Sequence, residues 1–232
     1  MSHSVGAFDD ERLVGFMLLA TGSINGKETV YNGGTGVVPE YRGRKLTEQM
    51  YAFILPKLAA AGYEHHLLEV ITTNTKAVKA YTKIGFSIKR MFRCFKGAVI
   101  NVSYGKYIPQ VIAQMPSFDT ADFYSTIPSW QLPTAAIERA LADHTIVTIT
   151  DNNVLLGYVV FMKLTGRIKQ IAVRKGNRRE GIGTALLAAV NEHVAGKEIS
   201  IINIDSNDSE TIAFFQAKGL QCYIEQYEMQ MP

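Results

Sequence analysis

The sequence contains few cysteines. Only Cys94 and Cys222 occur among its 232 residues, and neither has a histidine or another cysteine close by. Two thiols cannot build the disulfide framework of a small secreted domain, and their surroundings lack the closely spaced ligands of a zinc site. We therefore expect two small buried apolar side chains and no bound metal.

The sequence also lacks a long apolar run. Its longest apolar stretches, 13–20 (interrupted by Gly15) and 185–190, fall far short of the roughly eighteen residues of a membrane-spanning helix. The first six residues resemble neither a secretory signal nor an arginine-rich presequence. The sequence therefore predicts a cytoplasmic protein with no membrane partner.

A large excess of positive charge is likewise missing. The formal net charge is +3, and a nucleic-acid surface requires a local cluster of cations rather than a small total. The segment 89–96 interleaves cations with aromatics, but its alternation is typical of a half-exposed strand. We expect no nucleic-acid partner, and strongly salt-dependent binding to DNA or RNA would contradict this expectation.

The sequence does contain an internal repeat. Hydrophobic residues make up 47% of the chain, enough for a folded core. The length lies between one and two domains of about 150 residues, and the repeat favours two. The apolar segments 13–19 and 155–161 are strand candidates built around Gly15 and Gly157. Each is followed by a strand, a basic glycine-containing loop, a helix, a strand, a short helix and a final strand.

This order predicts an α/β fold with a mixed (α+β) sheet and at least one parallel strand pair in each half. The two longer helices are amphipathic, and each is expected to end at a glycine, Gly62 or Gly196. Their apolar residues recur at every fourth position: Leu46, Met50, Ile54 and Leu58 in the first, and Ile182, Leu186, Val190 and Val194 in the second.

Proline marks the expected linker. Four of the seven prolines lie between 107 and 133, so we expect domains at 1–106 and 134–232 joined by a linker at 107–133. The second domain is expected to open with a short helix at 134–141. The first domain looks incomplete, because barely a dozen residues precede Gly15. Either the sequence begins within this domain, or a partner subunit completes it, which would make a homodimer.

One of the basic loops has the features of an anion site. Residues 178–184 join the end of a strand to the start of a helix, where small residues expose backbone N–H groups at the positive end of the helix dipole. Arg178 and Arg179 add charge that suits phosphate oxygens. The loop is neither a Rossmann nor a P-loop motif, because glycines do not follow the strand directly and no Gly-Lys-Ser/Thr step occurs.

At this loop the sequence resembles the GNAT superfamily of acyl-CoA N-acyltransferases, whose signature is [RQ]-x-x-G-x-[GA]. Arg178, Gly181 and Gly183 match it. The segment before the loop resembles the family's splayed strand, and Asn207 stands where a family asparagine commonly contacts the cofactor. The resemblance implies two tandem GNAT-like domains with acetyl-CoA as cosubstrate in the second. The implied cofactor-binding residues are Ile171, Ala172, Val173, Arg178, Arg179, Glu180, Gly181, Ile182, Gly183, Thr184 and Asn207.

The first half departs from the family pattern at this loop. Aligning Arg42 with Arg178 places Lys45 opposite Gly181 and Thr47 opposite Gly183, so the first loop has lost both small residues. We therefore expect coenzyme binding in the second half.

The second half departs from the pattern elsewhere. Aligning Gly85 with Gly219 places Tyr81 opposite Phe215, and many family members use a tyrosine at this place to protonate the departing thiolate. Tyr81 and, by its place on the last strand, Tyr223 are the catalytic candidates. No general base is assigned, and an ordered water is sufficient for that role.

The resemblance implies an acetyl-CoA-dependent N-acetyltransferase in which a neutral amine attacks the thioester directly. The acceptor is expected to be a primary amine of a small molecule or a peptide. The alternative is a non-catalytic acyl-CoA-binding or regulatory module, which both Phe215 and the loss of small residues in the first loop favour. Release of free thiol from acetyl-CoA over a panel of amines distinguishes the two.

Overall fold

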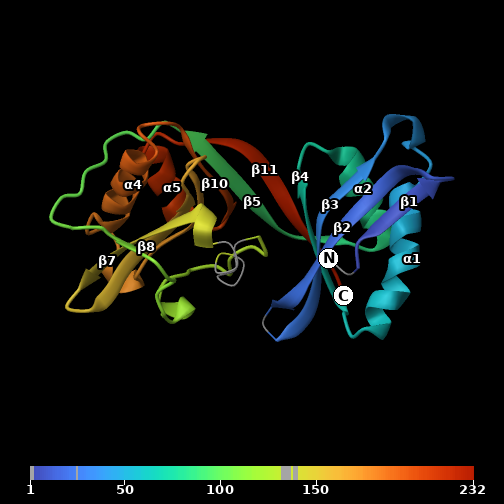
Figure 1. Cartoon of the computed structure of the whole chain (residues 1–232), viewed down its shortest axis with the longest axis horizontal. Helices are drawn as coiled ribbons and strands as arrows, with labels where there is room; N and C mark the ends of the chain where they lie inside the picture. The colour runs from blue at the N-terminus through green and yellow to red at the C-terminus, as the bar shows by residue number, and fades with distance from the viewer. Residues whose placement is uncertain (1–2, 25, 132–136, 138–140) are drawn as a thin grey trace. The chain divides into compact units, whose positions relative to one another are not determined.

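The computed structural model of the protein describes residues 3–24, 26–131, 137 and 141–232 (Figure 1). The helix expected at 134–141 lies almost entirely outside the described residues. The chain forms two compact units: Met1–Met91 with Gln226–Pro232, and Phe92–Glu225. These ranges differ from the expected 1–106 and 134–232. The expected linker 107–133 falls within unit 2, and the last residues of the chain fall within unit 1.

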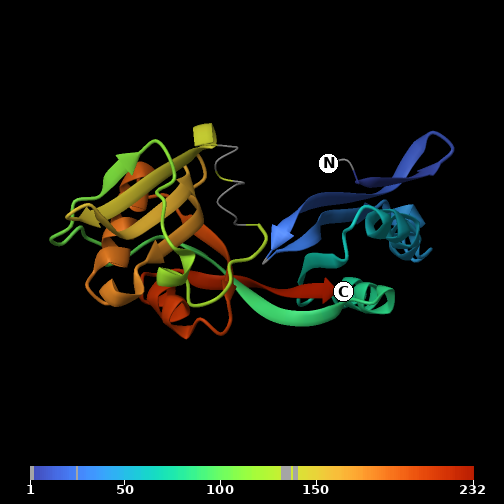
Figure 2. The ribbon, with the colours of Figure 1, turned by 90° about the horizontal axis from the view of Figure 1, so that it is seen from below.

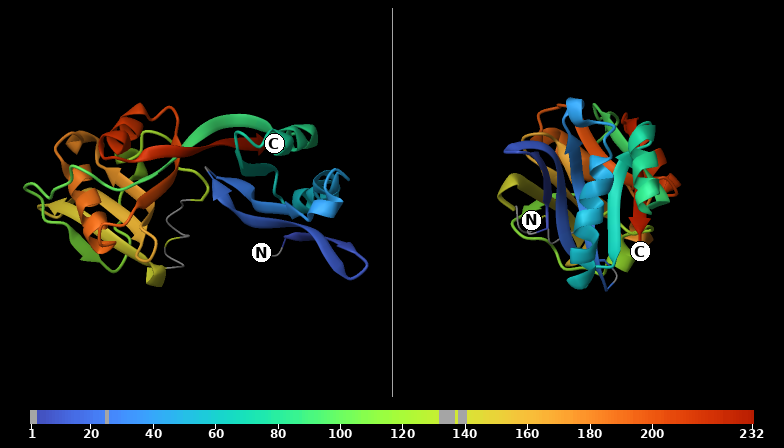
Figure 3. Two further views of the ribbon diagram at one scale, coloured as in Figure 1. Left: turned by 90° about the horizontal axis from the view of Figure 1, so that it is seen from above. Right: turned by 90° about the vertical axis from the view of Figure 1, so that its right-hand side faces the viewer.

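Unit 1 is a mixed sheet with two helices. In it β1 pairs antiparallel with β2, β2 antiparallel with β3, and β3 parallel with β4. α1 lies along the strands (Figure 3), and its buried face joins β2, β3 and β4 in one core. The complete elements are β1 (Val5–Asp9), β2 (Arg12–Ile24), β3 (Lys27–Val37), α1 (Leu46–Ala60), β4 (His65–Ile71) and α2 (Thr75–Ile84).

Unit 2 repeats this order. In it β7 pairs antiparallel with β8, β8 antiparallel with β9, and β9 parallel with β10. An additional strand, β6, pairs with β7, and the segment that contains it winds over the unit in yellow-green (Figure 2). The complete elements are β6 (Gln110–Ile112), β7 (His144–Asp151), β8 (Val154–Met162), β9 (Arg167–Val173), α4 (Ile182–His193), β10 (Ile199–Asp205) and α5 (Ser209–Ala217).

Two long strands have residues in both units. β5 (Ser87–Gly97) begins in unit 1, and its last residues pair antiparallel with β10. β11 (Gln221–Met231) begins in unit 2, and its residues from Gln226 onward pair antiparallel with β4. β5 is the last strand of the first repeat, and its end joins the sheet of unit 2. β11 is the last strand of the second repeat, and its end joins the sheet of unit 1. The expected boundaries missed this exchange, because strand periodicity does not show which sheet a strand joins.

The buried faces of α1 and α4 contain the apolar residues that recur at every fourth position in the sequence. In α1, Met50, Ile54 and Leu58 are buried, and in α4 the buried face includes Leu186 and Val190. The buried faces of α4 and α5 pack with β7, β8 and β9 in the largest core of the molecule. A second cluster on the opposite face of the unit 2 sheet is covered by aliphatic and aromatic side chains from 112–124. Both the α/β class and the mixed sheet are confirmed.

Close packing between α4 and the sheet requires a glycine at position 157. A Cβ there would lie 2.7 Å from the Ile182 side chain and 3.1 Å from the carbonyl oxygen of Ala172. α4 therefore approaches the sheet too closely for any side chain at this position. The repeated strand glycine that identified the two halves marks this close approach in unit 2.

Two kinds of feature are absent from the described residues. None of the helices there is both long and apolar enough to cross a membrane. Within the same residues no group of three histidine, cysteine or acidic side chains is placed to hold a metal ion.

Candidate functional site

The two parallel strands of unit 2 separate soon after they begin. β9 and β10 are paired through Arg167 with Ser200 and Ile168 with Ile201, whereas β9 remains paired with β8 as far as Val173. Among the described residues, the pairing of β9 with β10 ends at Ile168. Residues 169–173 of β9 line the space that opens between the two strands, where a ligand can reach the backbone.

The turn after β9 is built to leave backbone N–H groups free. The chain passes through left-handed conformations at Arg179, with a φ of 65°, and at Gly181, with a φ of 94°. Gly181 is the N-cap of α4 and makes no side-chain cap hydrogen bond. The first N–H groups of a helix have no intrahelical partner, and with the helix dipole they attract an anion.

The separated strands and this turn border one cavity of about 600 Å³. Nine of the predicted cofactor-binding residues line it. They are Ile171, Ala172, Val173, Arg178, Arg179, Gly181, Ile182, Gly183 and Thr184. The remaining two, Glu180 and Asn207, are not among the lining residues.

These two residues have partners of their own. The Glu180 carboxylate accepts hydrogen bonds from the Tyr107 hydroxyl at 3.2 Å and from the Asn177 amide at 3.5 Å. The backbone N–H of Asn207 donates to the Asp205 carboxylate at 2.9 Å. Their contact with a cofactor stays a prediction.

Gly183 leaves space that a side chain would fill. A Cβ at this position would lie 3.1 Å from the Phe214 ring, which also lines the cavity. The helix start and the cavity wall therefore approach each other closely. A larger residue here displaces the ring or projects into the cavity, where a ligand anion would meet it.

Arg178 connects the turn to a segment that sequence reasoning treated as a linker. Its guanidinium donates to the Ser125 hydroxyl at 2.9 Å, the Phe123 carbonyl at 2.8 Å and the Glu210 carboxylate at 3.2 Å. The neighbouring Arg174 forms an ion pair with Asp122 at 3.3 Å. Residues 123–128 line the cavity as a result.

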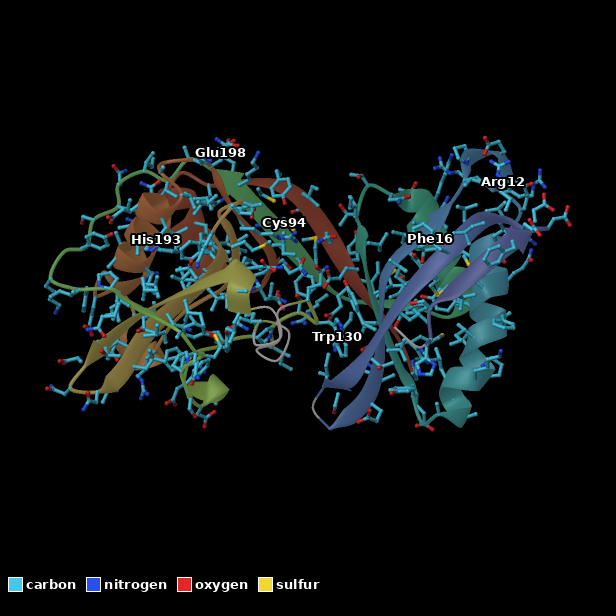
Figure 4. The ribbon with its side chains drawn as sticks, viewed as in Figure 1. Arg12, Phe16, Cys94, Trp130, His193 and Glu198 are labelled. Atoms are coloured by element: carbon cyan, nitrogen blue, oxygen red, sulfur yellow. The ribbon has the colours of Figure 1, made fainter. Side chains whose placement is uncertain are left out.

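These residues were missed because proline content dominates the sequence pattern of the segment. The usable signal was the aromatic content at 118–124, which indicates packing against a core rather than a solvated linker. The chain continues to Ser129, which is buried and accepts a hydrogen bond from the Asn203 side chain at 3.0 Å. Trp130, labelled in Figure 4, follows it.

A buried chain of hydroxyl groups lies against the same cavity. The Tyr124 and Tyr158 hydroxyls are hydrogen-bonded to each other, and Tyr158 donates to the Gln170 side chain at 3.1 Å. Tyr124 and Gln170 line the cavity. Burial raises the pKa of Tyr124 above its ordinary value of 10.0 and that of Tyr158 further still. Both hydroxyls are therefore protonated near neutral pH.

The two tyrosines selected from the sequence lie elsewhere. Tyr81, on α2 in unit 1, packs edge-on against Tyr51 and Phe86. Its pKa is raised by burial, against a hydrogen bond with Thr35 that lowers it. Tyr223, on β11, is 49% exposed. Neither is among the residues that line the cavity, and the catalytic role of each stays a prediction.

The N-caps of α2 and α5 support the residue-by-residue alignment of the two halves. Asn74 caps α2 by accepting from the Ala77 N–H, and Asp208 caps α5 by accepting from the Thr211 N–H. Asn74 therefore corresponds to Asp208, one residue after Asn207. The same register places Tyr81 opposite Phe215, which is completely buried and stacks on Phe95.

The turn before α1 in unit 1 has the same backbone conformation as the turn before α4 in unit 2, but it lacks the two small residues at the helix start. Arg42 and Arg178 have φ and ψ of −66° and 153°, and −67° and 156°, respectively. Gly43 takes the left-handed conformation of Arg179, and Lys45 that of Gly181. The cavity described in unit 1, of about 410 Å³, lies instead between α1 and the start of β4, beside Tyr63 and His66.

The site thus belongs to an α/β unit in which two parallel strands separate beside a glycine-containing helix start. Residues 2–86 match the Acetyltransferase (GNAT) family and residues 142–221 an Acetyltransferase (GNAT) domain. Together the matches cover more than half of the sequence. The chain belongs to the GNAT acetyltransferase superfamily and carries two of its domains in tandem.

Solved structures agree with this assignment. The chain is similar to a GCN5-related N-acetyltransferase from Sphaerobacter thermophilus at 15% identity and a TM-score of 0.66, covering 95% of this chain and 77% of that one. It is similar to a tandem GNAT protein from the clavulanic acid biosynthesis pathway at 14% identity and a TM-score of 0.70, covering 98% and 83%.

A putative acetyltransferase from Pyrococcus horikoshii gives a TM-score of 0.71 at 11% identity, covering 99% of this chain and 73% of that one. At these identities the likeness establishes the fold. No curated protein shows a significant match to the sequence.

Proposed function

We propose that the protein is an acetyl-CoA-dependent N-acetyltransferase that binds acetyl-CoA in the cavity of unit 2. It transfers the acetyl group to a primary amine of a small molecule or a peptide. The observation that carries the proposal is the start of α4 at Gly181, which has no side-chain cap and borders the cavity together with residues 169–173 of β9.

The lining residues fit a coenzyme A moiety. The N–H groups at the start of α4 and the cations of Arg178 and Arg179 suit its diphosphate. Beyond its last pair with β10, β9 lines the cavity from Lys169 to Val173, and a strand edge offers backbone donors and acceptors to an extended chain with amide groups. The cavity volume of about 600 Å³ is within the range of cofactor sites.

Acetyl-CoA supplies the activated acyl thioester, and the chain supplies orientation and proton control. Backbone N–H groups of β9 around Ile171 to Val173 are the proposed donors for negative charge that develops on a carbonyl oxygen, and one such donor contributes about 3 kcal/mol. Tyr124 is the tyrosine among the lining residues that the structure describes. Because burial keeps its hydroxyl protonated, we propose it as the proton donor to a leaving thiolate.

Isothermal titration with acetyl-CoA tests the proposed binding site. The wild type is expected to bind, and Gly183→Asp is expected to weaken binding by roughly a hundredfold, about 2.7 kcal/mol, because it places a carboxylate at the anion site. Thr47→Asp is the matched control, since Thr47 holds the equivalent place on α1, and its affinity should equal that of the wild type. Absence of wild-type binding, or equal loss in both variants, would contradict the proposal.

A specific observation favours a second candidate, a non-catalytic acyl-CoA-binding module. Phe215, buried at the place that corresponds to Tyr81, carries no hydroxyl. The two candidates differ in turnover. Thiol release from acetyl-CoA that depends on an added amine and is lost in Gly183→Asp supports the enzyme. Binding without thiol release over a broad amine panel supports the module.

A further inference from the structure

Two lysines line the cavity, Lys169 and Lys218, and the Lys218 ammonium donates to the Asn101 carbonyl at 2.8 Å. Lys169 is the first residue of β9 beyond the last pair with β10, and it lines the cavity between the separated strands. The next four residues of β9 line the same cavity. Lys169 therefore lies on the strand segment where we propose that acetyl-CoA binds.

The surroundings of Lys169 leave its amine without a counter-charge. The side chain is half-buried, and within the described parts of the chain its ammonium makes no ion pair or hydrogen bond. Burial, and next the Arg167 cation, lower the pKa of Lys169 below its ordinary value. A larger fraction of the amine is therefore neutral near pH 7 than for a solvated lysine.

The carboxylates that line the cavity have other partners. Asp205 accepts from the backbone N–H of Asn207, Asp208 from the N–H of Thr211, and Glu210 from the Arg178 guanidinium. In the part of the chain that the structure describes, none of the three forms an ion pair with Lys169, and the Glu210 carboxylate contacts Arg178 and Arg179 instead. The amine is thus free to react rather than held in a salt bridge.

We propose that Lys169 is an internal acceptor, acetylated by the acetyl-CoA bound in its own cavity. This inference rests on the proposed function. The lone pair of the neutral ε-amine attacks the carbonyl carbon of the thioester. A C–N bond forms and the C–S bond breaks. The nitrogen loses one proton and the departing thiolate gains one, through water, to give Nε-acetyl-lysine and free coenzyme A.

Acetylation of this residue changes the cavity in two ways. It removes the positive charge of Lys169, and it adds an acetyl group to a side chain that already lines the cavity. Both changes alter what the site accepts, so internal acetylation while no external amine is present should lower the turnover measured when an amine is added later. External amines would then protect Lys169 by consuming the acetyl group first.

Peptide mass spectrometry after incubation with isotopically labelled acetyl-CoA tests the proposal. Lys163, exposed on the turn before β9, is the matched control for reaction in solution. Lys169 is expected to be acetylated roughly tenfold faster or more, because a bound donor is held near it at high effective concentration. Gly183→Asp and excess free coenzyme A should slow Lys169 to the rate of Lys163.

A second readout needs no coenzyme. Trace labelling with acetic anhydride across a pH series reports the neutral fraction of each lysine, and Lys169 should become reactive at lower pH than Lys163. Equal acetyl-CoA labelling of the two lysines, or Lys169 labelling unaffected by Gly183→Asp, would overturn the inference. If titration shows acetyl-CoA binding in that case, only the internal acceptor fails, whereas absence of binding rejects the proposed function itself.

Discussion

Lys45 and Gly181 hold the same left-handed backbone position at the N-caps of α1 and α4, with φ angles of 59° and 94°. The backbone of the turn is thus preserved in both halves, while its chemistry is not. A lysine at this place brings a long side chain and a conformation that costs free energy. A glycine brings neither, so we expect the turn of unit 2 to leave its amides more open to a bulky anion than the turn of unit 1.

Replacing Lys45 by glycine should stabilise the protein. The change relieves a left-handed conformation that costs 1–2 kcal/mol for a residue with a Cβ, less the chain entropy that glycine adds to the unfolded state. We expect the free energy of unfolding to rise by roughly 0.5–1 kcal/mol, measured by denaturant titration. The converse change, Gly181→Lys, should lower both stability and acetyl-CoA affinity. An unstable Lys45→Gly protein would show that the lysine side chain is needed.

The two strands that have residues in both units are tied together by a buried ion pair. Arg90 on β5 donates to both carboxylate oxygens of Glu228 on β11, at 2.8 and 3.0 Å, and the Glu228 side chain is only 3% exposed. Removing one charge of a buried pair leaves the other uncompensated. Glu228→Gln is therefore expected to cost about 3 kcal/mol of unfolding free energy.

The matched control lies on the same strand. Glu225 pairs with Arg93 at 3.1 Å, but both side chains are more than a third exposed. Glu225→Gln should cost less than about 1 kcal/mol, because solvent screens an exposed pair. Similar losses in the two variants would refute the assignment of Glu228 as the buried anchor.

The stability of the protein should fall in mild acid. His66 is 5% exposed, and burial, followed by the neighbouring His65, lowers its pKa below 6.5. Because the folded pKa is the lower one, the unfolded chain binds more protons between the two values. The stability contributed by neutral His66 is therefore present above pH 6.5 and is lost as the pH falls through the folded pKa.

Thermal melts at pH 7 and pH 5 measure this effect. His66→Gln should melt with a smaller difference between the two pH values than the wild type, since the titrating group is gone. His3→Gln removes a histidine from a more exposed position and should keep the wild-type difference. The account of His66 fails if the two variants show the same dependence.

Arg178 should hold the segment at 123–125 in place before any ligand binds. Arg178→Gln removes its hydrogen bonds to Ser125 and Phe123. Trp130 is the single tryptophan of the sequence, so its fluorescence reports on this part of the chain. We expect red-shifted emission in Arg178→Gln. Arg179→Gln should leave the emission unchanged, because the Arg179 side chain is 80% exposed and its Glu210 contact is 4.0 Å long.

Much of the fold could be predicted because local patterns determine it. Apolar residues at every fourth position located α1 and α4. The repeated strand glycine identified the two halves, and at Gly157 it allows α4 to pack closely on the sheet. The signature at Arg178, Gly181 and Gly183 located the turn, because the left-handed conformation and close packing there demand small residues. These features depend on residues near one another in sequence.

What the sequence could not predict depends on distant contacts. Strand periodicity is the same whichever sheet a strand joins, so the exchange of β5 and β11 between units was not expected. The cavity wall at 123–128 depends on hydrogen bonds from Arg178, more than fifty residues away. Lys169 gave no sequence signal, because its position becomes notable only once β9 and β10 separate.

Hydrogen–deuterium exchange with and without acetyl-CoA tests the central claim most directly, because it observes the backbone N–H groups themselves. The account predicts slower exchange at 178–184 and along 169–173 when acetyl-CoA is added. It predicts no change at 42–48, although that turn has the same backbone conformation. Protection at 42–48 without protection at 178–184, or no protection in either turn, would contradict the account.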